Sequence, residues 1–99
     1  MNIQKQYLER LKKLILENTH SEPVKIWLFG SHAKGAARRY SDIDIAILPL
    51  GQLRPGFIGE LKEKIAESTI PYSVDLVDLS QTDEEFRNKV LNEGILWKG

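Results

Sequence analysis

GSHAKG at residues 30–35, followed closely by SDIDI at residues 41–45, is the part of the sequence that decides the fold. The first stretch places glycine and small residues directly after an apolar run, which is typical of a turn at the end of a strand. The second alternates acidic and apolar residues with the period of a β-strand. Side chains two positions apart in a strand share a face, so we expect Asp42 and Asp44 to project together, opposite Ile43.

Helices and strands alternate around these two stretches. Apolar residues between Ile3 and Ile15 recur at helical spacing and predict an amphipathic helix that ends near Asn18. The run VKIWLF at 24–29 is rich in β-branched and aromatic residues and predicts a buried strand. Further along the chain we expect a short helix at 31–37, a strand at 42–48, a loop at 49–56, a second amphipathic helix from residue 57 and a strand at 72–79.

A capping box predicts the last helix, since Thr82 precedes Glu85 by three residues. The buried face of this helix is expected to consist of Phe86, Val90 and Leu91. Residues 95–97 then finish the chain. The whole order predicts one α/β domain over residues 1–99, in which helices flank a small sheet in two or three layers.

Composition excludes several classes of protein. The 99 residues carry 14 basic and 14 acidic side chains, so the chain lacks the excess positive charge typical of direct nucleic-acid binding. The absence of cysteine excludes disulfides, zinc–thiolate sites and thiol nucleophiles. The first residues are polar and charged, and no apolar run approaches the roughly 18 residues of a membrane span. We therefore expect a soluble cytoplasmic protein.

The junction at Gly30 and Ser31 is the expected phosphate site. A glycine lets the backbone approach a ligand closely, and backbone N–H groups at the start of a helix attract phosphate oxygens. Ser31 adds a hydroxyl donor, and Lys34, Arg38 and Arg39 follow where they could neutralise triphosphate charge. The alternatives are an ordinary N-cap after a turn glycine and a solvated basic loop.

Acidic side chains in otherwise apolar strands are the second chemical signal. Asp is poorly suited to strands, yet Asp44 and Asp75 each stand between two apolar residues. If their strands are neighbours, Asp75 can join Asp42 and Asp44. Asp78 falls on the opposite face and is expected to cap or to lie in a loop. The alternative for Asp42 and Asp44 is ordinary turn chemistry and a solvent-facing strand position.

Three clustered carboxylates suit divalent cations and phosphoryl transfer. Adjacent carboxylates repel one another unless a cation lies between them, and oxygen ligands favour Mg²⁺, with Mn²⁺ an alternative that the sequence does not distinguish. In a site with two such ions, one lowers the pKa of an attacking hydroxyl and the other stabilises the triphosphate and the departing pyrophosphate. Asp75 is the expected general base.

These motifs resemble the signature of the DNA polymerase β-type nucleotidyltransferase superfamily. The matching motifs are GSHAKG at 30–35, SDID at 41–44 and VDL at 74–76. Over nearly its whole length the chain is similar to the minimal nucleotidyltransferases, the MNT or MntA-type antitoxins encoded beside HEPN-domain proteins. The resemblance implies a mixed sheet flanked by helices, with nucleotide phosphates at Gly30 and Ser31 and Mg²⁺ at the three aspartates.

The resemblance also implies a function in a toxin–antitoxin system. It predicts an enzyme that moves AMP from ATP, or another nucleotide from its triphosphate, to a tyrosine hydroxyl of a HEPN-type toxin ribonuclease, an AMPylation that silences the toxin. The chain has room only for a catalytic domain, so we expect the acceptor to arrive on a partner or a neighbouring subunit to complete the groove. The competing hypotheses are a non-catalytic antitoxin that masks the toxin and transfer to a small molecule.

The histidines and tryptophans are predicted to have structural roles. His20 and His32 lack the spacing of a metal-binding pair and are expected at the surface. Trp27 is expected in the core, whereas Trp97 either completes the core or belongs to a partner surface.

Overall fold

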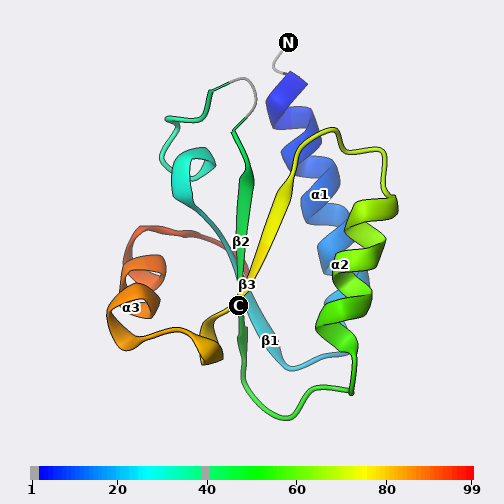
Figure 1. Ribbon diagram of the computed structural model, residues 1–99, viewed down its shortest axis with the longest axis vertical. Coiled ribbons are helices and arrows are strands. Elements are labelled where there is room, and N and C mark those ends of the chain that lie inside the picture. The colour runs from blue at the N-terminus through cyan, green and yellow to red at the C-terminus, as the bar shows by residue number, and fades with distance from the viewer. Residues whose placement is uncertain (1–2, 39–40) are drawn as a thin grey trace.

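A four-stranded mixed sheet runs through the middle of the molecule, with helices on both of its faces (Figure 1). The computed structural model describes residues 3–38 and 41–99. The strands lie in the order β3-β2-β1-β4, with β1 antiparallel to both of its neighbours and β2 parallel to β3. Their bounds are Val24–Phe29 for β1, Ile43–Pro49 for β2, Val74–Asp78 for β3 and Ile95–Lys98 for β4.

Three layers result, because the helices divide between the two faces of the sheet (Figure 1). Helices α1 (Ile3–Thr19) and α2 (Phe57–Glu67) cover one face, and α3 (Glu84–Glu93) covers the other. Short 3₁₀ helices, η1 (Gly30–His32) and η2 (Leu79–Gln81), follow β1 and β3. The predicted α/β class with helices flanking a small mixed sheet is confirmed. Within residues 3–38 and 41–99, no helix has the length and apolar character needed to span a membrane.

Strand β2 is buried on both faces, and its side chains alternate between two apolar clusters. Ile43, Ile45 and Ile47 are fully buried on the side of α1 and α2. Ala46 lies in the second cluster, between the sheet and α3. Asp44 has the parity of Ala46, so the backbone directs its side chain toward the α3 side, at the end of that cluster.

Several element boundaries differ from those predicted. Strand β2 begins at Ile43 rather than at 42, and β3 is shorter than the predicted 72–79. The short helix expected at 31–37 is a single 3₁₀ turn at Gly30–His32, because Gly35 adopts a positive φ of 69° that does not continue a right-handed helix. The sequence predicts no element for residues 95–97, but Ile95–Lys98 forms the edge strand β4 through a bulged pairing with β1.

The start of the last helix is also corrected. Asp83, not Thr82, is the N-cap of α3, and its Oδ1 accepts a hydrogen bond from the Phe86 N–H at 2.7 Å. The Thr82 hydroxyl instead donates to the Leu79 carbonyl in the preceding 3₁₀ turn. Leu91, predicted to be buried, is 40% exposed, whereas Val90 is buried as expected.

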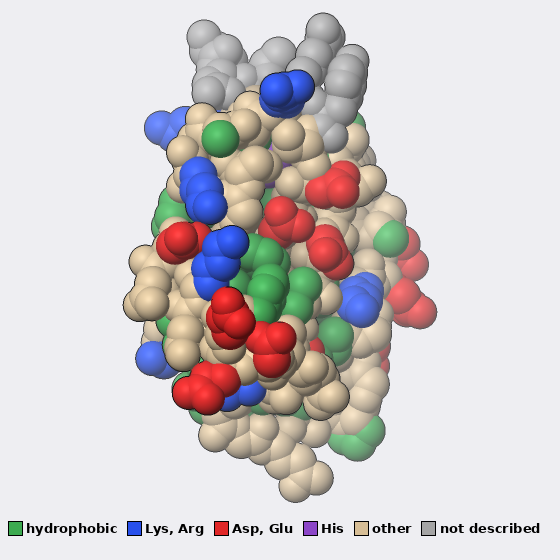
Figure 2. Space-filling view, turned by 60° about the vertical axis from the view of Figure 1, so that its left-hand side comes forward, with side chains coloured by type: hydrophobic (Ala, Val, Ile, Leu, Met, Phe, Trp, Pro, Cys, Tyr) green, Lys and Arg blue, Asp and Glu red, His purple; other side chains and the backbone are tan. Residues whose placement is uncertain are grey.

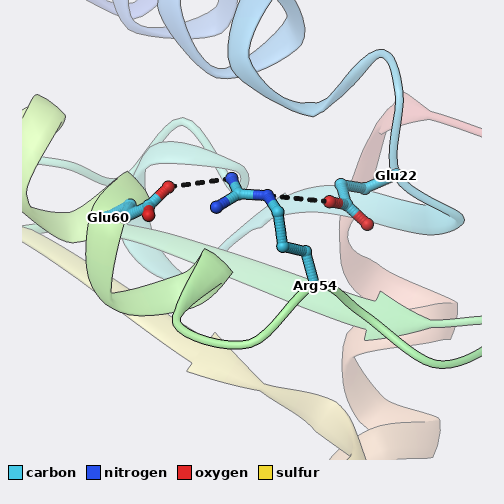
Figure 3. A network of polar contacts seen from close by, with 3 residues as sticks. All are labelled: Glu22, Arg54 and Glu60. Atoms are coloured by element: carbon cyan, nitrogen blue, oxygen red, sulfur yellow. Dashed lines mark ion pairs between the residues drawn. The ribbon is translucent and has the colours of Figure 1, made fainter.

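The loop between β2 and α2 is held by a small ion-pair network (Figure 3). Arg54 lies 2.8 Å from Glu60 on α2 and 3.6 Å from Glu22, which precedes β1. This network lies at the end of the sheet where β2 finishes and β1 starts. The residues predicted to carry chemistry gather at the opposite end.

Candidate functional site

The pairing of β2 with β3 places two of the predicted acidic residues side by side. Asp44 and Asp75 are register partners in this parallel pair, so their side chains leave the sheet on the same face. Asp44 is partly buried and Asp75 is exposed. The expectation that the two acid-bearing strands are neighbours is confirmed.

Asp42 lies just before β2 and is exposed to solvent. It does not belong to the strand, so strand alternation alone does not direct its side chain. The peptide units on either side of it are nevertheless held. The Ser41 carbonyl accepts a hydrogen bond from His32, and the Ile43 N–H donates to the Ser73 carbonyl at 2.9 Å.

Asp44 feels the negative charges of its two acidic neighbours. Partial burial raises the pKa of Asp44, and the negative charges of Asp75 and Asp42 raise that pKa further, while His32 acts in the opposite direction. The surrounding protein therefore does not fully offset the free-energy cost of ionising the Asp44 carboxylate. A cation beside it would remove that penalty.

Gly30 brings the turn after β1 against Asp44. Its φ of 74° lies in the left-handed region that favours glycine, and a Cβ built there would overlap Oδ2 of Asp44 and lie 3.2 Å from its Cγ. Ser31 follows within the same 3₁₀ turn, which is closed by hydrogen bonds from Ala33 and Lys34 to the Gly30 carbonyl. The two predicted motifs thus meet in space.

Lys34 stands next to this turn, on the side of α3. Its Nζ lies 3.4 Å from Oε2 of Glu93, and both side chains are about half exposed. They border a pocket of about 170 Å³, whose apolar lining includes Phe29 and Phe86. Figure 2 turns the α3 side of the molecule forward and shows an apolar area surrounded by acidic and basic groups.

The other predicted basic residues contribute less to the site. Arg38 is exposed, and its backbone N–H donates to the Ser41 hydroxyl at 2.8 Å. Arg39 lies outside the described residues. Asp78 caps the following turn by accepting hydrogen bonds from the Ser80 N–H and hydroxyl, in agreement with its predicted capping role.

His32 was expected at the surface, and this prediction is wrong. Only 8% of the residue is exposed, its Nε2 donates to the Ser41 carbonyl at 3.0 Å, and its ring packs edge-on against Tyr72. Sequence reasoning missed this residue because the contacts depend on a loop nine residues away and on a tyrosine forty residues away. His20 is exposed as predicted.

The tryptophans lie on opposite sides of the sheet. Trp27 is buried in the cluster beneath α3, which confirms its predicted place in the core. Trp97 is partly buried and packs against the cluster formed with α1 and α2, so it completes the core on that side.

The donor chemistry of the three aspartates fits a hard divalent cation. Carboxylate oxygens are the ligands that Mg²⁺ and Mn²⁺ accept. Burial, followed by repulsion from Asp75 and Asp42, raises the pKa of Asp44, and a nearby cation would offset both effects. Among residues 3–38 and 41–99, however, no group of three His, Cys, Asp or Glu side chains is already placed to hold a metal ion. The backbone places the three aspartates near one another, but their side-chain oxygens are not arranged as a finished coordination site.

Comparison with protein families gives a match over most of the chain. The family model described as polymerase beta, nucleotidyltransferase matches residues 9–98. A relative from Haemophilus influenzae named probable protein adenylyltransferase MntA is 45% identical over 62 residues, which are 63% of this chain and 54% of the relative. The protein adenylyltransferase MntA of Shewanella oneidensis is 41% identical over 69 residues, 70% of this chain and 49% of that protein. This chain spans about half the length of the curated relatives it matches.

Solved structures of toxin–antitoxin proteins share the fold. A crystal structure of a toxin–antitoxin with AMP-PNP superposes with a TM-score of 0.70 at 33% identity, covering 89% of this chain and 73% of the other. A structure of a tri-AMPylated Shewanella oneidensis HEPN toxin in complex with MNT antitoxin gives a TM-score of 0.66 at 31% identity, covering 98% and 73%.

Proposed function

This chain belongs to the polymerase β nucleotidyltransferase family, and we propose that it transfers AMP from ATP to a tyrosine hydroxyl of a HEPN-type toxin, so that it acts as an antitoxin. The observation that carries this proposal is the register pairing of Asp44 with Asp75 directly beside the Gly30 turn. An acidic pair next to a turn with close backbone access suits a phosphate ester bound through a cation.

Each predicted residue has a role in this reaction. Gly30 and Ser31 bind the phosphates of ATP, and Lys34 adds a positive charge beside them. Asp42, Asp44 and Asp75 hold Mg²⁺, with two ions expected and Mn²⁺ an acceptable substitute. When bound, such cations neutralise phosphate charge and lower the pKa of the attacking hydroxyl.

The transfer releases pyrophosphate and a proton from the acceptor hydroxyl. The acceptor oxygen bonds to the α-phosphorus, the bond from that phosphorus to the bridging oxygen of the β-phosphate breaks, and pyrophosphate leaves. Asp75 accepts the proton of the hydroxyl, because it is the exposed member of the pair and lies on the strand farther from the phosphate turn.

Similar proteins support the choice of nucleotide and acceptor. Two curated relatives are named protein adenylyltransferases, which favours transfer of AMP. One similar structure holds AMP-PNP, and another is a complex of an MNT antitoxin with a tri-AMPylated HEPN toxin. A HEPN-type partner is therefore the acceptor to test first.

Transfer of labelled nucleotide tests the proposal directly. The chain is co-expressed with a HEPN partner, incubated with Mg²⁺ and ATP labelled at the α-phosphate, and the partner is examined for label. We expect the label on the partner with the wild-type chain and its loss with Asp44→Asn. Protection from the toxin without label, unchanged by Asp44→Asn, would instead support a masking antitoxin.

Lys34→Ala is expected to weaken ATP binding without destabilising the fold. The side chain is half exposed and its ion pair with Glu93 is a surface pair, so the free energy of unfolding should change by less than about 1 kcal/mol. We expect the KM for ATP to rise by roughly threefold to tenfold, equivalent to about 1 kcal/mol of lost charge interaction. Glu93→Gln is the matched control, because it breaks the same ion pair but leaves the lysine. A rise in KM of equal size in both variants would contradict the role of Lys34.

A further inference from the structure

We propose that His32 is a positioning residue that sets the direction of the Asp42 carboxylate relative to the phosphate turn. This inference rests on the proposed function, since it concerns the same group of aspartates. His32 ends the 3₁₀ turn that begins at Gly30, so it links that turn to the loop that carries Asp42.

Hydrogen bonds hold the two peptide planes that flank Asp42. The Ser41 carbonyl belongs to the plane before this residue and accepts a hydrogen bond from Nε2 of His32 at 3.0 Å. The Ile43 N–H belongs to the plane after it and donates to the Ser73 carbonyl at 2.9 Å. Peptide planes are rigid, so holding both of them restricts φ and ψ of Asp42 and therefore the direction of its Cβ. Within residues 3–38 and 41–99, Asp42 takes part in no strand pairing, and these two hydrogen bonds fix its backbone instead.

The imidazole ring also contacts the segment that leads into β3. Its centroid lies 5.9 Å from that of Tyr72 in an edge-to-face arrangement, and Tyr72 makes a second such contact with Tyr7 of α1 at 5.8 Å. Tyr72 precedes Asp75 by three residues. The buried His32 side chain therefore contacts both the segment that precedes Asp42 and the segment that precedes Asp75. His32 itself belongs to the turn that begins at Gly30.

Packing alone does not explain a histidine at this position. Because a carbonyl only accepts, Nε2 carries the proton in the neutral ring and Nδ1 is left as an acceptor. This Nδ1 is buried and has no hydrogen-bond partner among residues 3–38 and 41–99. An apolar side chain of similar size would fill the space without leaving a buried acceptor unpaired. The benefit of the imidazole lies in the hydrogen bond that it donates to Ser41.

Two substitutions separate the hydrogen bond from the packing. His32→Leu fills much of the same volume and cannot donate, whereas His32→Gln places an amide N–H near the position of Nε2 and can restore the bond. His20→Leu is the matched control, because His20 also contacts a backbone carbonyl, that of Glu17 at 2.9 Å, but lies on the exposed end of α1. Urea denaturation of each variant establishes that it is folded.

Two measurements on the full chain then test the proposal. Hydrogen exchange of the Ile43 amide, followed by NMR, reports whether the backbone around Asp42 is held. Titration of Mn²⁺ in the presence of a non-hydrolysable ATP analogue reports the geometry of the aspartates without any reaction. For His32→Leu we expect about tenfold faster exchange at Ile43, with the centre of β2 unchanged, and about tenfold weaker Mn²⁺ binding, the size typical of residues that orient metal ligands. For His32→Gln and His20→Leu we expect both values within threefold of the wild type.

The outcomes distinguish this inference from the proposed function. Wild-type chain that does not bind Mn²⁺ with the analogue overturns both. Wild-type chain that binds, together with a folded His32→Leu variant that binds equally well, overturns the positioning role alone. The same holds if His32→Gln is as impaired as His32→Leu, since the lost property would then not be the donated hydrogen bond.

Discussion

Asp44→Asn is expected to abolish nucleotidyl transfer and, at the same time, to make the metal-free chain more stable. Asparagine has nearly the same shape but no negative charge, so it offers a cation one weak oxygen ligand instead of a carboxylate. Several kcal/mol of transition-state stabilisation depend on a catalytic metal, and each 1.36 kcal/mol corresponds to a factor of ten in rate. We therefore expect a loss of transfer of about 10³-fold or more.

The gain in stability follows from the raised pKa of Asp44. Burial, then the charges of Asp75 and Asp42, raise this pKa in the folded chain above the ordinary 3.8. The folded state therefore binds a proton more tightly than the unfolded state does. At pH values below the pKa of Asp44 in the unfolded chain, this group makes its full contribution to the stability of the fold. That contribution is lost as pH rises through the pKa of Asp44 in the folded chain. At neutral pH the ionised Asp44 destabilises the fold, and asparagine removes that effect.

Urea denaturation in the presence of EDTA measures this gain. We expect Asp44→Asn to raise the free energy of unfolding at pH 7 by about 0.5–1 kcal/mol, a small value because solvent screens a partly exposed carboxylate. The difference from wild type should shrink as pH falls toward the unfolded pKa. Asp78→Asn is the matched control on β3, because an amide oxygen can still accept from Ser80 and the residue lies on the opposite face. An Asp44→Asn variant that is less stable than wild type at pH 7 would contradict the electrostatic account.

The order of elements could be predicted because local patterns dominate it. Strand β2 alternates between a buried isoleucine face and the face of Asp44 and Ala46, and this alternation is visible in seven consecutive residues. The face on which Asp75 lies also follows from alternation. The direct pairing of Asp75 with Asp44 does not follow from alternation, because the register depends on how two strands separated by a helix come together.

Features that depend on distant contacts could not be predicted. Strand β4 has only four residues, and its pairing partner β1 lies about seventy positions earlier in the chain. The capping box predicts the wrong N-cap for α3, because Thr82 and Asp83 are both good capping residues. The hydrogen bond from Thr82 to the preceding 3₁₀ turn leaves the cap to Asp83. The burial of His32 likewise depends on Tyr72, which no local pattern connects to it.

Gly30→Ala is the second substitution with a large expected effect, and it should lower activity far more than it lowers stability. Gly30 has a φ of 74°, and alanine in this left-handed region costs about 1–2 kcal/mol. The added Cβ also overlaps Oδ2 of Asp44, the end of a short side chain that can turn away. The carboxylate must then leave its place beside the turn, and we expect transfer to fall by about 100-fold, since small displacements of catalytic groups have effects of that size.

Gly56→Ala provides the matched control for the backbone strain. Gly56 has nearly the same φ, 78°, but, its chain neighbours aside, no atom in the described part of the chain lies within 4 Å of the position that a Cβ would take. It stands before α2 at the other end of the sheet. We expect both variants to lose similar stability in urea denaturation, and only Gly30→Ala to lose activity.

A double-mutant cycle can show that the loss of activity arises from the contact between Gly30 and Asp44. Asp44→Ala removes the carboxylate that a Cβ at Gly30 would meet, so Gly30→Ala in that background should lower stability only by the backbone strain. Binding of the ATP analogue, measured without metal, then compares the phosphate turn in the single and double variants. If Gly30→Ala weakens that binding equally with and without the Asp44 carboxylate, the glycine serves the phosphates directly. If the effect becomes smaller when the carboxylate is removed, the glycine is also required because it leaves room for Asp44, and this second result is the one we expect.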